Sequence, residues 1–436
     1  MRLLIILAFL ISTIARSEDY SYAIVSSKNT STDTDWAKVI DVLKNKHNGK
    51  LIVYMNSTDE VEYPLSKLMP RYTAFVAKPD EVTKEFVAKV HQLTRSLDDD
   101  PYGDTIWGII TGFNAQNAYN IVSVNKPLII RRVVAGTSIP LEYFSEGVWY
   151  SEGKAGFGIK KDKGGTPYKI NPPVDTTKLF VDELNGNADM FVTSGHATER
   201  DWQIGYSYKN GAFKSQNGLL YGVDTAGNKF QIKSAHPRVY LPVGNCLMGH
   251  IDNSNAMALA FLNSASVVQM IGYTVPTWFG FMGWGILDYF AEQPGRFTLS
   301  EAFFANQQAL IWQLQKNTSS KGLLYDRDVV AFYGDPAFES RIEPVPSGWE
   351  QTLVRTNDTF ILNIKLLKGE KSFDLIDPNG SQRGKRPIFQ ILPIKLGKYK
   401  LLEGEEYQPV ITENFILVPQ PQKLDKTEFR IVLKNI

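Results

Sequence analysis

The sequence contains very little cysteine and histidine. Cys246 is the single cysteine among 436 residues, and there are five histidines. A lone thiol in an exported chain cannot form an intramolecular disulfide and remains a free thiol, inert if it only fills the core and reactive if a base lies beside it. The spacing of these few residues matches no compact zinc signature.

The chain also lacks an excess of charge of either sign. There are 47 basic and 46 acidic residues, which gives a formal net charge of +1, and no basic run occurs. No electrostatic field therefore favours nucleic acid or an anionic membrane, and we expect neither as a partner. The hydrophobic fraction of 43% allows a large core, and the length predicts two or three domains.

Long apolar runs are missing except at the start of the chain. Met1-Arg2 is followed by the apolar run 3–14, and Ala15-Arg16-Ser17 fits a small-x-small cleavage site. That run is shorter than the roughly 18 residues typical of a transmembrane helix, and no later run reaches that length. We therefore expect residues 1–17 to be a signal peptide, and the protein to be exported without a transmembrane segment to the periplasm, the cell surface or the medium.

Apolar periodicity predicts strands that alternate with helices through the first three quarters of the chain. Such alternation is typical of an α/β fold with a mostly parallel sheet and helices on both faces. The stretch 153–173, rich in Gly, Lys and Pro, indicates a boundary between an N-terminal subdomain, 18–152, and a second one, 153–345. Short turn-bounded strands without helical period then predict a separate β-sandwich over 346–436. The expected helices are 35–46, 79–97, 115–122, 176–184, 256–262 and 298–313, the last opened by a capping box of Thr298 with Glu301.

Two polar segments follow predicted buried strands. His196 follows the strand 190–193, and Cys246 follows the strand 239–243. If these strands are neighbours, their carboxyl ends meet at one edge of the sheet, where open α/β sheets place their chemistry. A thiol beside an imidazole is a good nucleophile at neutral pH, so the pair predicts cysteine-based catalysis.

These residues resemble a known family. His196-Ala197-Thr198-Glu199 with Trp202, and Gly244-Asn245-Cys246 further on, resemble the gingipain-type cysteine peptidases of the caspase–gingipain clan. Three further segments resemble the same family: Asp100-Pro101-Tyr102-Gly103 before 107–112, the stretch 274–278 with its tryptophan, and Tyr333-Gly334-Asp335-Pro336-Ala337. The resemblance extends over residues 105–346. It implies a caspase-like catalytic subdomain and an immunoglobulin-like C-terminal sandwich.

The resemblance also assigns roles to residues. Cys246 is expected to form a thioester acyl-enzyme with a protein or peptide substrate, and His196 is expected to act as acid and base. The position after the histidine, a glycine in the family, is Ala197 here, and its backbone N–H is expected to stabilise the oxyanion. Expected substrate contacts are Trp278, Thr274 and Asn245.

The carboxylate that orients His196 is left open by the sequence. Glu146 and Glu152 both occur in a Ser-Glu-Gly context after earlier strands. We name Glu146 as the expected orienting group and keep Glu152 as the alternative.

Three other hypotheses remain at this point. In the first, the scaffold is catalytically idle and the protein is a surface binding or adhesion protein. In the second, His196, His250 and Asp252 form the site of a metal hydrolase. For Trp278 the alternative is a place in the core. No cofactor is expected, although the acidic turn 98–104 could hold a structural calcium ion; a solvated loop is the simpler interpretation. We expect a monomer.

Overall fold

The computed structural model describes residues 22–421 and 426–436. The expected signal peptide, residues 1–17, lies outside this part of the chain. Within the described residues, no helix is both long enough and apolar enough to span a bilayer.

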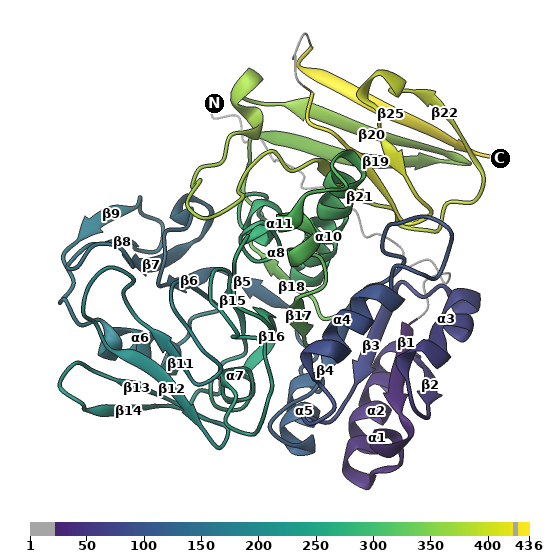
Figure 1. Cartoon of the computed structure of the whole chain (residues 1–436). Helices are drawn as coiled ribbons and strands as arrows, with labels where there is room; N and C mark the ends of the chain where they lie inside the picture. The colour runs from purple at the N-terminus through teal and green to yellow at the C-terminus, as the bar shows by residue number, and fades with distance from the viewer. Residues whose placement is uncertain (1–21, 422–425) are drawn as a thin grey trace, which may run out of the picture.

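A twelve-stranded sheet runs through the molecule (Figure 1). Its strands follow the spatial order β2 (Lys50–Tyr54), β1 (Tyr22–Ser27), β3 (Tyr72–Val76), β4 (Ile106–Ile110), β17 (Val330–Tyr333), β16 (Val267–Tyr273), β15 (Arg238–Pro242), β10 (Met190–Thr193), β6 (Arg132–Ala135), β7 (Glu146–Tyr150), β8 (Gly158–Lys161) and β9 (Tyr168–Ile170).

The sheet consists of two halves that lie side by side. Within each half the strands are parallel, and the strands of one half run opposite to those of the other. Strands β2, β1, β3, β4 and β17 run parallel to one another, as do β16, β15, β10, β6 and β7. The two halves join where β16 pairs antiparallel with β17, and β8 and β9 add an antiparallel edge. The carboxyl ends of β16, β15, β10, β6 and β7 therefore open on one edge. The expected mostly parallel sheet is confirmed.

Helices cover both faces of the first half of the sheet. Alternate residues of a strand point to opposite faces, so each strand contributes side chains to both helix layers. Tyr22 and Ile24 pack in a cluster with α2 (Thr34–His47) and α5 (Ala115–Val122). Ala23 and Val25 belong to the main core on the other face, where Trp107 of β4 contacts α4 (Lys84–Leu93) and α10 (Leu299–Lys316). The remaining helices are α1 (Lys28–Thr32), α3 (Glu62–Leu68), α6 (Thr177–Asn185), α7 (Met257–Ser264), α8 (Phe281–Trp284), α9 (Ile286–Phe290) and α11 (Lys321–Asp326).

A small antiparallel sheet lies beside the second half. It contains β11 (Asp201–Gln203), β12 (Ala212–Gln216), β13 (Leu219–Val223) and β14 (Lys229–Ile232). Asn217 and Gly218 join β12 to β13 with φ of 49° and 70°, the positive angles that a two-residue hairpin turn requires. Strands β5 (Leu128–Ile130) and β18 (Ser340–Ile342) form a separate two-stranded parallel sheet.

Two expected helix starts differ from the structure. The helix expected over 79–97 is shorter, because the Thr83 hydroxyl accepts the Phe86 N–H and begins α4 at Lys84. The helix expected over 256–262 is α7, which begins at Met257, after Ala256, without a side-chain cap. The capping box of Thr298 and Glu301 at the start of α10 is confirmed.

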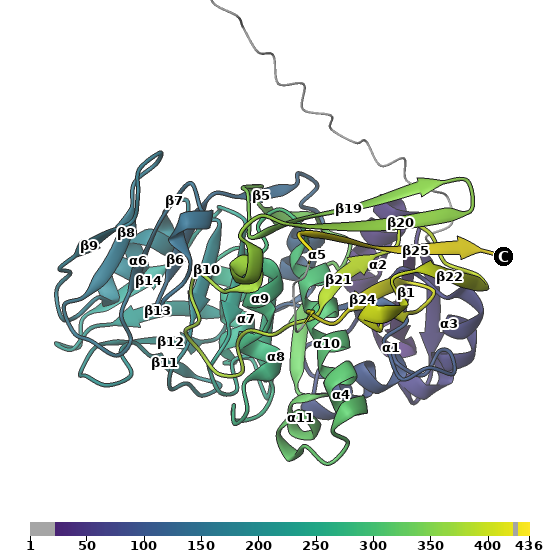
Figure 2. The same ribbon diagram turned by 90° about the horizontal axis from the view of Figure 1, so that it is seen from above.

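The C-terminal residues form the expected β-sandwich, placed over α10 and the first half of the sheet (Figures 1 and 2). One sheet has the order β19 (Trp349–Thr356), β20 (Thr359–Leu366), β25 (Glu428–Asn435) and β22 (Tyr399–Glu403), and the other β21 (Ile388–Ile391), β24 (Phe415–Val418) and β23 (Val410–Ile411). The two sheets enclose a separate apolar core. Phe304 of α10 packs its ring against Phe389 and Phe415, so an apolar interface joins the sandwich to the α/β part.

The expected boundary between residues 152 and 153 falls within the large sheet. Strands β7 and β8 on either side of it pair antiparallel, and β6 and β7 lie beside β10 in the second half. The expected subdomains therefore exchange strands within one continuous sheet.

Candidate active site

His196 and Cys246 follow neighbouring strands. Strands β10 and β15 pair in parallel, with Met190 opposite Val239 and Thr193 opposite Pro242. The segments that leave these strands carry His196, which is exposed, and Cys246, which is half-buried. The expectation that the two residues lie at one edge of the sheet is confirmed. Strand β16, which leads to Trp278, is the next strand beyond β15, as also expected.

Asn245 ties the two segments together. Its side chain is fully buried, its Oδ1 accepts the Thr193 hydroxyl at 2.6 Å, and its Nδ2 donates to the Gly195 carbonyl at 3.0 Å. Because each bond reaches across from the Cys246 segment to the His196 segment, Asn245 fixes one loop relative to the other. The expected contact of Asn245 with substrate is therefore wrong: a fully buried amide with both ends paired cannot reach a ligand.

The His196 loop is held at several backbone atoms. Trp202 Nε1 donates to the Ser194 carbonyl at 2.8 Å, and the Gln203 N–H donates to the His196 carbonyl at 2.9 Å. Gly195 has a φ of +91°, which favours glycine at this sharp turn. Ala197 pairs with Trp202 in the non-hydrogen-bonded position of an antiparallel bridge, so this pairing leaves the Ala197 N–H unused.

The Cys246 loop presents the sulfur to a backbone donor. The Thr277 N–H donates to Sγ at 3.2 Å, and the Thr277 hydroxyl donates to the Asn245 carbonyl at 3.0 Å. A donor aimed at sulfur stabilises negative charge on it. Leu247, directly after Cys246, has a φ of +60°, a strained angle for a branched residue and one that clusters at functional sites.

The two candidate carboxylates lie at opposite ends of β7. Glu146 begins the strand and forms an ion pair with Arg132 at 2.8 Å, at the edge away from Cys246. Glu152 lies beyond the carboxyl end, where its oxygens accept the hydroxyls of Ser194 and of Thr137, the latter at 2.9 Å. The position of Glu146 therefore does not support the orienting role expected of it, and of the two candidates Glu152 is the one at the His196 and Cys246 end of β7, because a strand separates its two ends by its whole length.

Burial raises the pKa of Glu152, and hydrogen bonds from Ser194, Thr137 and Asn379 oppose that rise. The Glu152 backbone carbonyl also accepts the N–H of Tyr206, whose ring lies over the His196 ring with centroids 5.1 Å apart. Glu152 and His196 therefore share two connections, one through Ser194 and one through Tyr206.

An exposed aromatic side chain, Trp278, directly follows Thr277, the residue whose N–H donates to the sulfur. Trp278 is 64% exposed and its ring meets Tyr325 edge-on at 5.6 Å, so the alternative that Trp278 packs in the core is wrong. Burial first, then the charges of Asp326 and Cys246, raise the pKa of Tyr325, whose hydroxyl donates to the Pro276 carbonyl at 2.7 Å. Thr274 is 2% exposed and its hydroxyl donates to the Val329 carbonyl, so the expected substrate contact of Thr274 is also wrong.

Two of the three residues of the metal-hydrolase hypothesis, His250 and Asp252, bind different side chains. His250 Nδ1 lies 3.2 Å from Glu199 Oε1, and Asp252 forms an ion pair with Arg200. In the described part of the chain, the group of three side chains with metal-ligand geometry lies elsewhere, at Asp98, Asp100 and Glu413. The acidic turn thus gains a carboxylate from the C-terminal sandwich.

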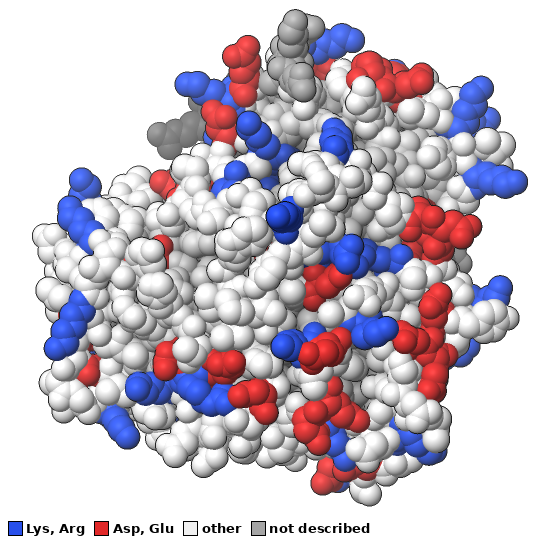
Figure 3. Space-filling view, viewed as in Figure 1, with Lys and Arg blue, Asp and Glu red and all other residues white. Residues whose placement is uncertain are grey.

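The surface offers no large field of one charge on the face drawn in Figure 3, where basic and acidic side chains are interspersed. This agrees with the balanced composition. Recognition by bulk charge is not favoured on this face.

Comparisons with known proteins give structural likeness only. No family model matches the sequence, and no curated protein matches it. Among solved structures, the Arg-specific cysteine proteinase gingipain R (RgpB) is 12% identical over 96% of both chains, with a TM-score of 0.47. The complex of Porphyromonas gingivalis RgpB pro- and mature domains is 11% identical over 79% of this chain and 86% of that one, also with a TM-score of 0.47.

Proposed function

We propose that this protein is an exported cysteine endopeptidase of the gingipain type, with Cys246 and His196 as its catalytic dyad. The observation that carries the proposal is the parallel pairing of β10 with β15, which brings the two segments to one edge, together with the Asn245 bonds that hold them there. The immunoglobulin-like character of the C-terminal sandwich belongs to the same proposal.

The proposed chemistry uses this chain's own groups. The Cys246 thiolate attacks the carbonyl carbon of the scissile bond, and the oxygen takes the negative charge of the tetrahedral intermediate. The free N–H of Ala197 is the expected donor to that oxygen. His196 gives its proton to the leaving amine, which leaves a thioester on Cys246, and then takes a proton from the water that hydrolyses the thioester.

Glu152 is the proposed orienting group. A carboxylate near the imidazole fixes its tautomer and favours its protonated form. The tie through Ser194 to the residue pair that precedes the histidine supports this role for Glu152.

Trp278 is proposed as one wall of the pocket for the substrate side chain. Its exposed indole meets the Tyr325 ring and directly follows Thr277, which binds the Cys246 sulfur, so it offers a flat apolar surface near the thiol. Such a wall discriminates between side chains by contact area rather than by charge.

The test is hydrolysis of a peptide library by the processed protein beside Cys246→Ala and His196→Ala. Each variant is expected to abolish hydrolysis with an unchanged circular dichroism spectrum, and the double variant should lose no more than either single one, because a dyad acts as a unit. His236→Ala is the matched control, since His236 pairs with Asp189 at the start of β10, at the opposite edge. Activity of Cys246→Ala within a factor of about two of the wild type would end the proposal.

The idle-scaffold alternative predicts a different result from the same experiment. It predicts no hydrolysis of any library member by the wild type, while the metal-hydrolase alternative predicts loss of activity with a chelator and none with a thiol alkylator. Structural calcium at the acidic turn stays a separate hypothesis: it predicts that added Ca²⁺ raises the melting temperature of the wild type and not that of Asp98→Asn.

A further inference from the structure

One segment of the C-terminal sandwich leaves its own domain. Residues 374–387, called the strap below, connect a short 3-10 turn, Gly369–Phe373, to β21. Instead of crossing the surface of the sandwich, the strap contacts the edge of the large sheet where His196 and Cys246 lie. Its contacts fall into three groups: an anchor, a contact on the His196 side and a contact on the Cys246 side.

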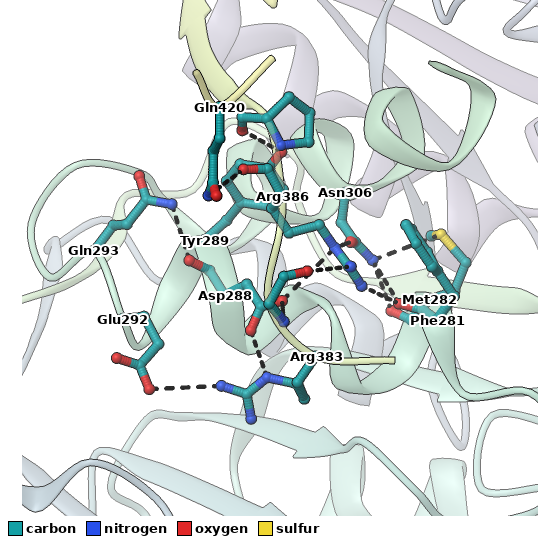
Figure 4. A network of polar contacts seen from close by, with 12 residues as sticks. Phe281, Met282, Asp288, Tyr289, Glu292, Gln293, Asn306, Arg383, Arg386 and Gln420 are labelled. Atoms are coloured by element: carbon teal, nitrogen blue, oxygen red, sulfur yellow. Dashed lines mark hydrogen bonds and ion pairs between the residues drawn. The ribbon is translucent and has the colours of Figure 1, made fainter. Parts of the chain in front are cut away.

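The anchor is a buried network of charges between the strap and the residues around α9 (Figure 4). Arg383 binds Asp288, and the Gly384 N–H donates to the other Asp288 oxygen at 2.8 Å. The Arg383 and Asp288 side chains are each 2% exposed. Glu292 accepts the N–H groups of Ile376 and Asp377 at 3.0 Å each. Because breaking a buried ion pair leaves an uncompensated charge, these contacts hold the strap in one position.

The strap reaches the His196 side through Asn379. Its Nδ2 donates to the Thr137 hydroxyl at 2.8 Å, and that hydroxyl donates in turn to Glu152 Oε1 at 2.9 Å. Next to this relay, the Ser138 hydroxyl donates to Asp377 at 2.5 Å. Glu152 is therefore connected on one oxygen to Ser194 of the His196 loop and on the other, through Thr137, to the strap.

The strap reaches the Cys246 side through Gly380. A Cβ built on Gly380 would lie 2.2 Å from the indole of Trp284, so this glycine, at a φ of +110°, lets the backbone lie directly on the ring. The same indole contacts Gly244, where a Cβ would lie 2.9 Å from Nε1. Trp284 thus connects the strap to the turn that carries Asn245 and Cys246.

We propose that the strap is a built-in part of the active site, in which Asn379 acts through Thr137 as a positioning residue for Glu152 and Gly380 supports the Cys246 turn through Trp284. This inference rests on the proposed function, since it names what holds the orienting carboxylate of the same site. The C-terminal sandwich then contributes to catalysis through this segment.

The charge state of Glu152 makes the proposal measurable. Burial raises the pKa of this carboxyl, and its hydrogen-bond donors lower it. Loss of the Asn379 contact removes one stabiliser of the charged form, so Glu152 stays protonated to a higher pH. Tyr208 is an ionisable neighbour that feels the Glu152 charge, and because burial and that charge raise its pKa, it stays neutral across the measured range.

The experiment compares pH profiles of the folded full chain. The rate of alkylation by iodoacetamide reports Cys246 alone, because it is the single cysteine, and kcat/KM for a cleaved peptide is measured in parallel. Asn379→Ala is expected to move the acidic limb of both profiles upward by about one pH unit, the scale on which one hydrogen bond changes a carboxyl pKa. Thr137→Val, which keeps the side-chain shape but removes the hydroxyl that donates to Glu152, should move the limb in the same direction.

The controls separate position from general damage. Asn363→Ala makes the same substitution on β20 of the same domain, away from the strap, and should leave both profiles unchanged. Glu146→Gln is the matched control for Glu152→Gln: only the latter should remove the limb that Asn379→Ala shifts.

The outcomes distinguish the strap from the proposed function. If the pH profiles of Asn379→Ala and Thr137→Val superimpose on that of the wild type, the proposed role of the strap is wrong. This holds even if the wild type hydrolyses peptides and Cys246→Ala does not. A shifted alkylation profile in a protein that cleaves no peptide would support the positioning role of the strap and contradict the proposed peptidase function.

Discussion

Replacement of Asn245 by alanine separates the geometry of the dyad from the stability of the fold. Asn245 makes two hydrogen bonds, to the Thr193 hydroxyl and to the Gly195 carbonyl. The Thr193 hydroxyl keeps the Tyr240 phenol as a partner at 2.9 Å, while the Gly195 carbonyl loses its donor. Because one partner is left unpaired, at about 1–3 kcal/mol for such a group in a buried site, the expected cost in unfolding free energy is about 1–3 kcal/mol.

The expected loss of activity is larger than this cost alone implies. Without the tie, the His196 and Cys246 loops are free to separate, and a displacement of about 1 Å lowers catalysis about 10²-fold. We therefore expect kcat to fall about 100-fold at a temperature where Asn245→Ala is fully folded. Asn245→Asp should behave alike, because a carboxylate accepts from Thr193 but cannot donate to Gly195.

Asn117 offers a matched control. It is also buried and also bridges two segments, accepting the Phe113 N–H at 3.0 Å and donating to the Leu262 carbonyl at 3.0 Å. Asn117→Ala should lower the melting temperature by a similar amount without changing kcat/KM. If Asn245→Ala keeps kcat/KM within about threefold of Asn117→Ala, the two loops do not depend on the Asn245 tie and the reasoning fails.

Two further predictions follow from exposure and charge. Trp278→Ala should leave the melting temperature nearly unchanged, because the indole is 64% exposed, while kcat/KM changes by different factors for different peptides; a uniform loss with a large fall in melting temperature would contradict a pocket wall. Burial, followed by the charge of Asp98, raises the pKa of Asp104 to about 9, and burial also raises that of Glu413. Since an unfolded Asp titrates near pH ~3.9, the folded chain retains protons that the unfolded chain releases, and stability should fall as pH rises from about 4 to about 9. Urea midpoints measured over this range should fall less steeply for Asp104→Asn, and an unchanged slope would show that Asp104 does not titrate in this way.

The sequence predicted the placement of the dyad better than its surroundings. Strand ends and chain order are local signals, so the sequence alone assigns His196 and Cys246 to one edge of the sheet. The choice between Glu146 and Glu152 could not, because both have the same neighbours and only the true start of β7 places one at each end. Asn245 was expected to contact substrate because it precedes Cys246 in the motif. A position in a motif does not show whether the side chain is buried, and that of Asn245 is.

The strap was beyond sequence reasoning for a different reason. Residues 374–387 have no periodicity, and their partners Thr137, Trp284 and Asp288 are far away in the chain. A contact of this kind depends on how two finished domains pack, which no short window of sequence encodes. The same holds for Glu413, which joins the acidic turn at Asp98 only in the assembled molecule.

The pairing of β4 with β17, which are far apart in the sequence, also bears on how the chain folds during synthesis. Strand β4, buried along its whole length, has β3 on one side and β17 on the other, and Ile109 pairs with Tyr333 from the far end of the α/β part. While the chain emerges from the ribosome, β1 to β4 can fold with α2, α4 and α5 long before β17 exists. During that interval β4 is an apolar edge strand with open hydrogen-bonding groups, which is a template for aggregation. Expression yield should therefore depend on protecting this edge, and a fragment that ends before residue 330 should precipitate even though every helix around the first four strands is present.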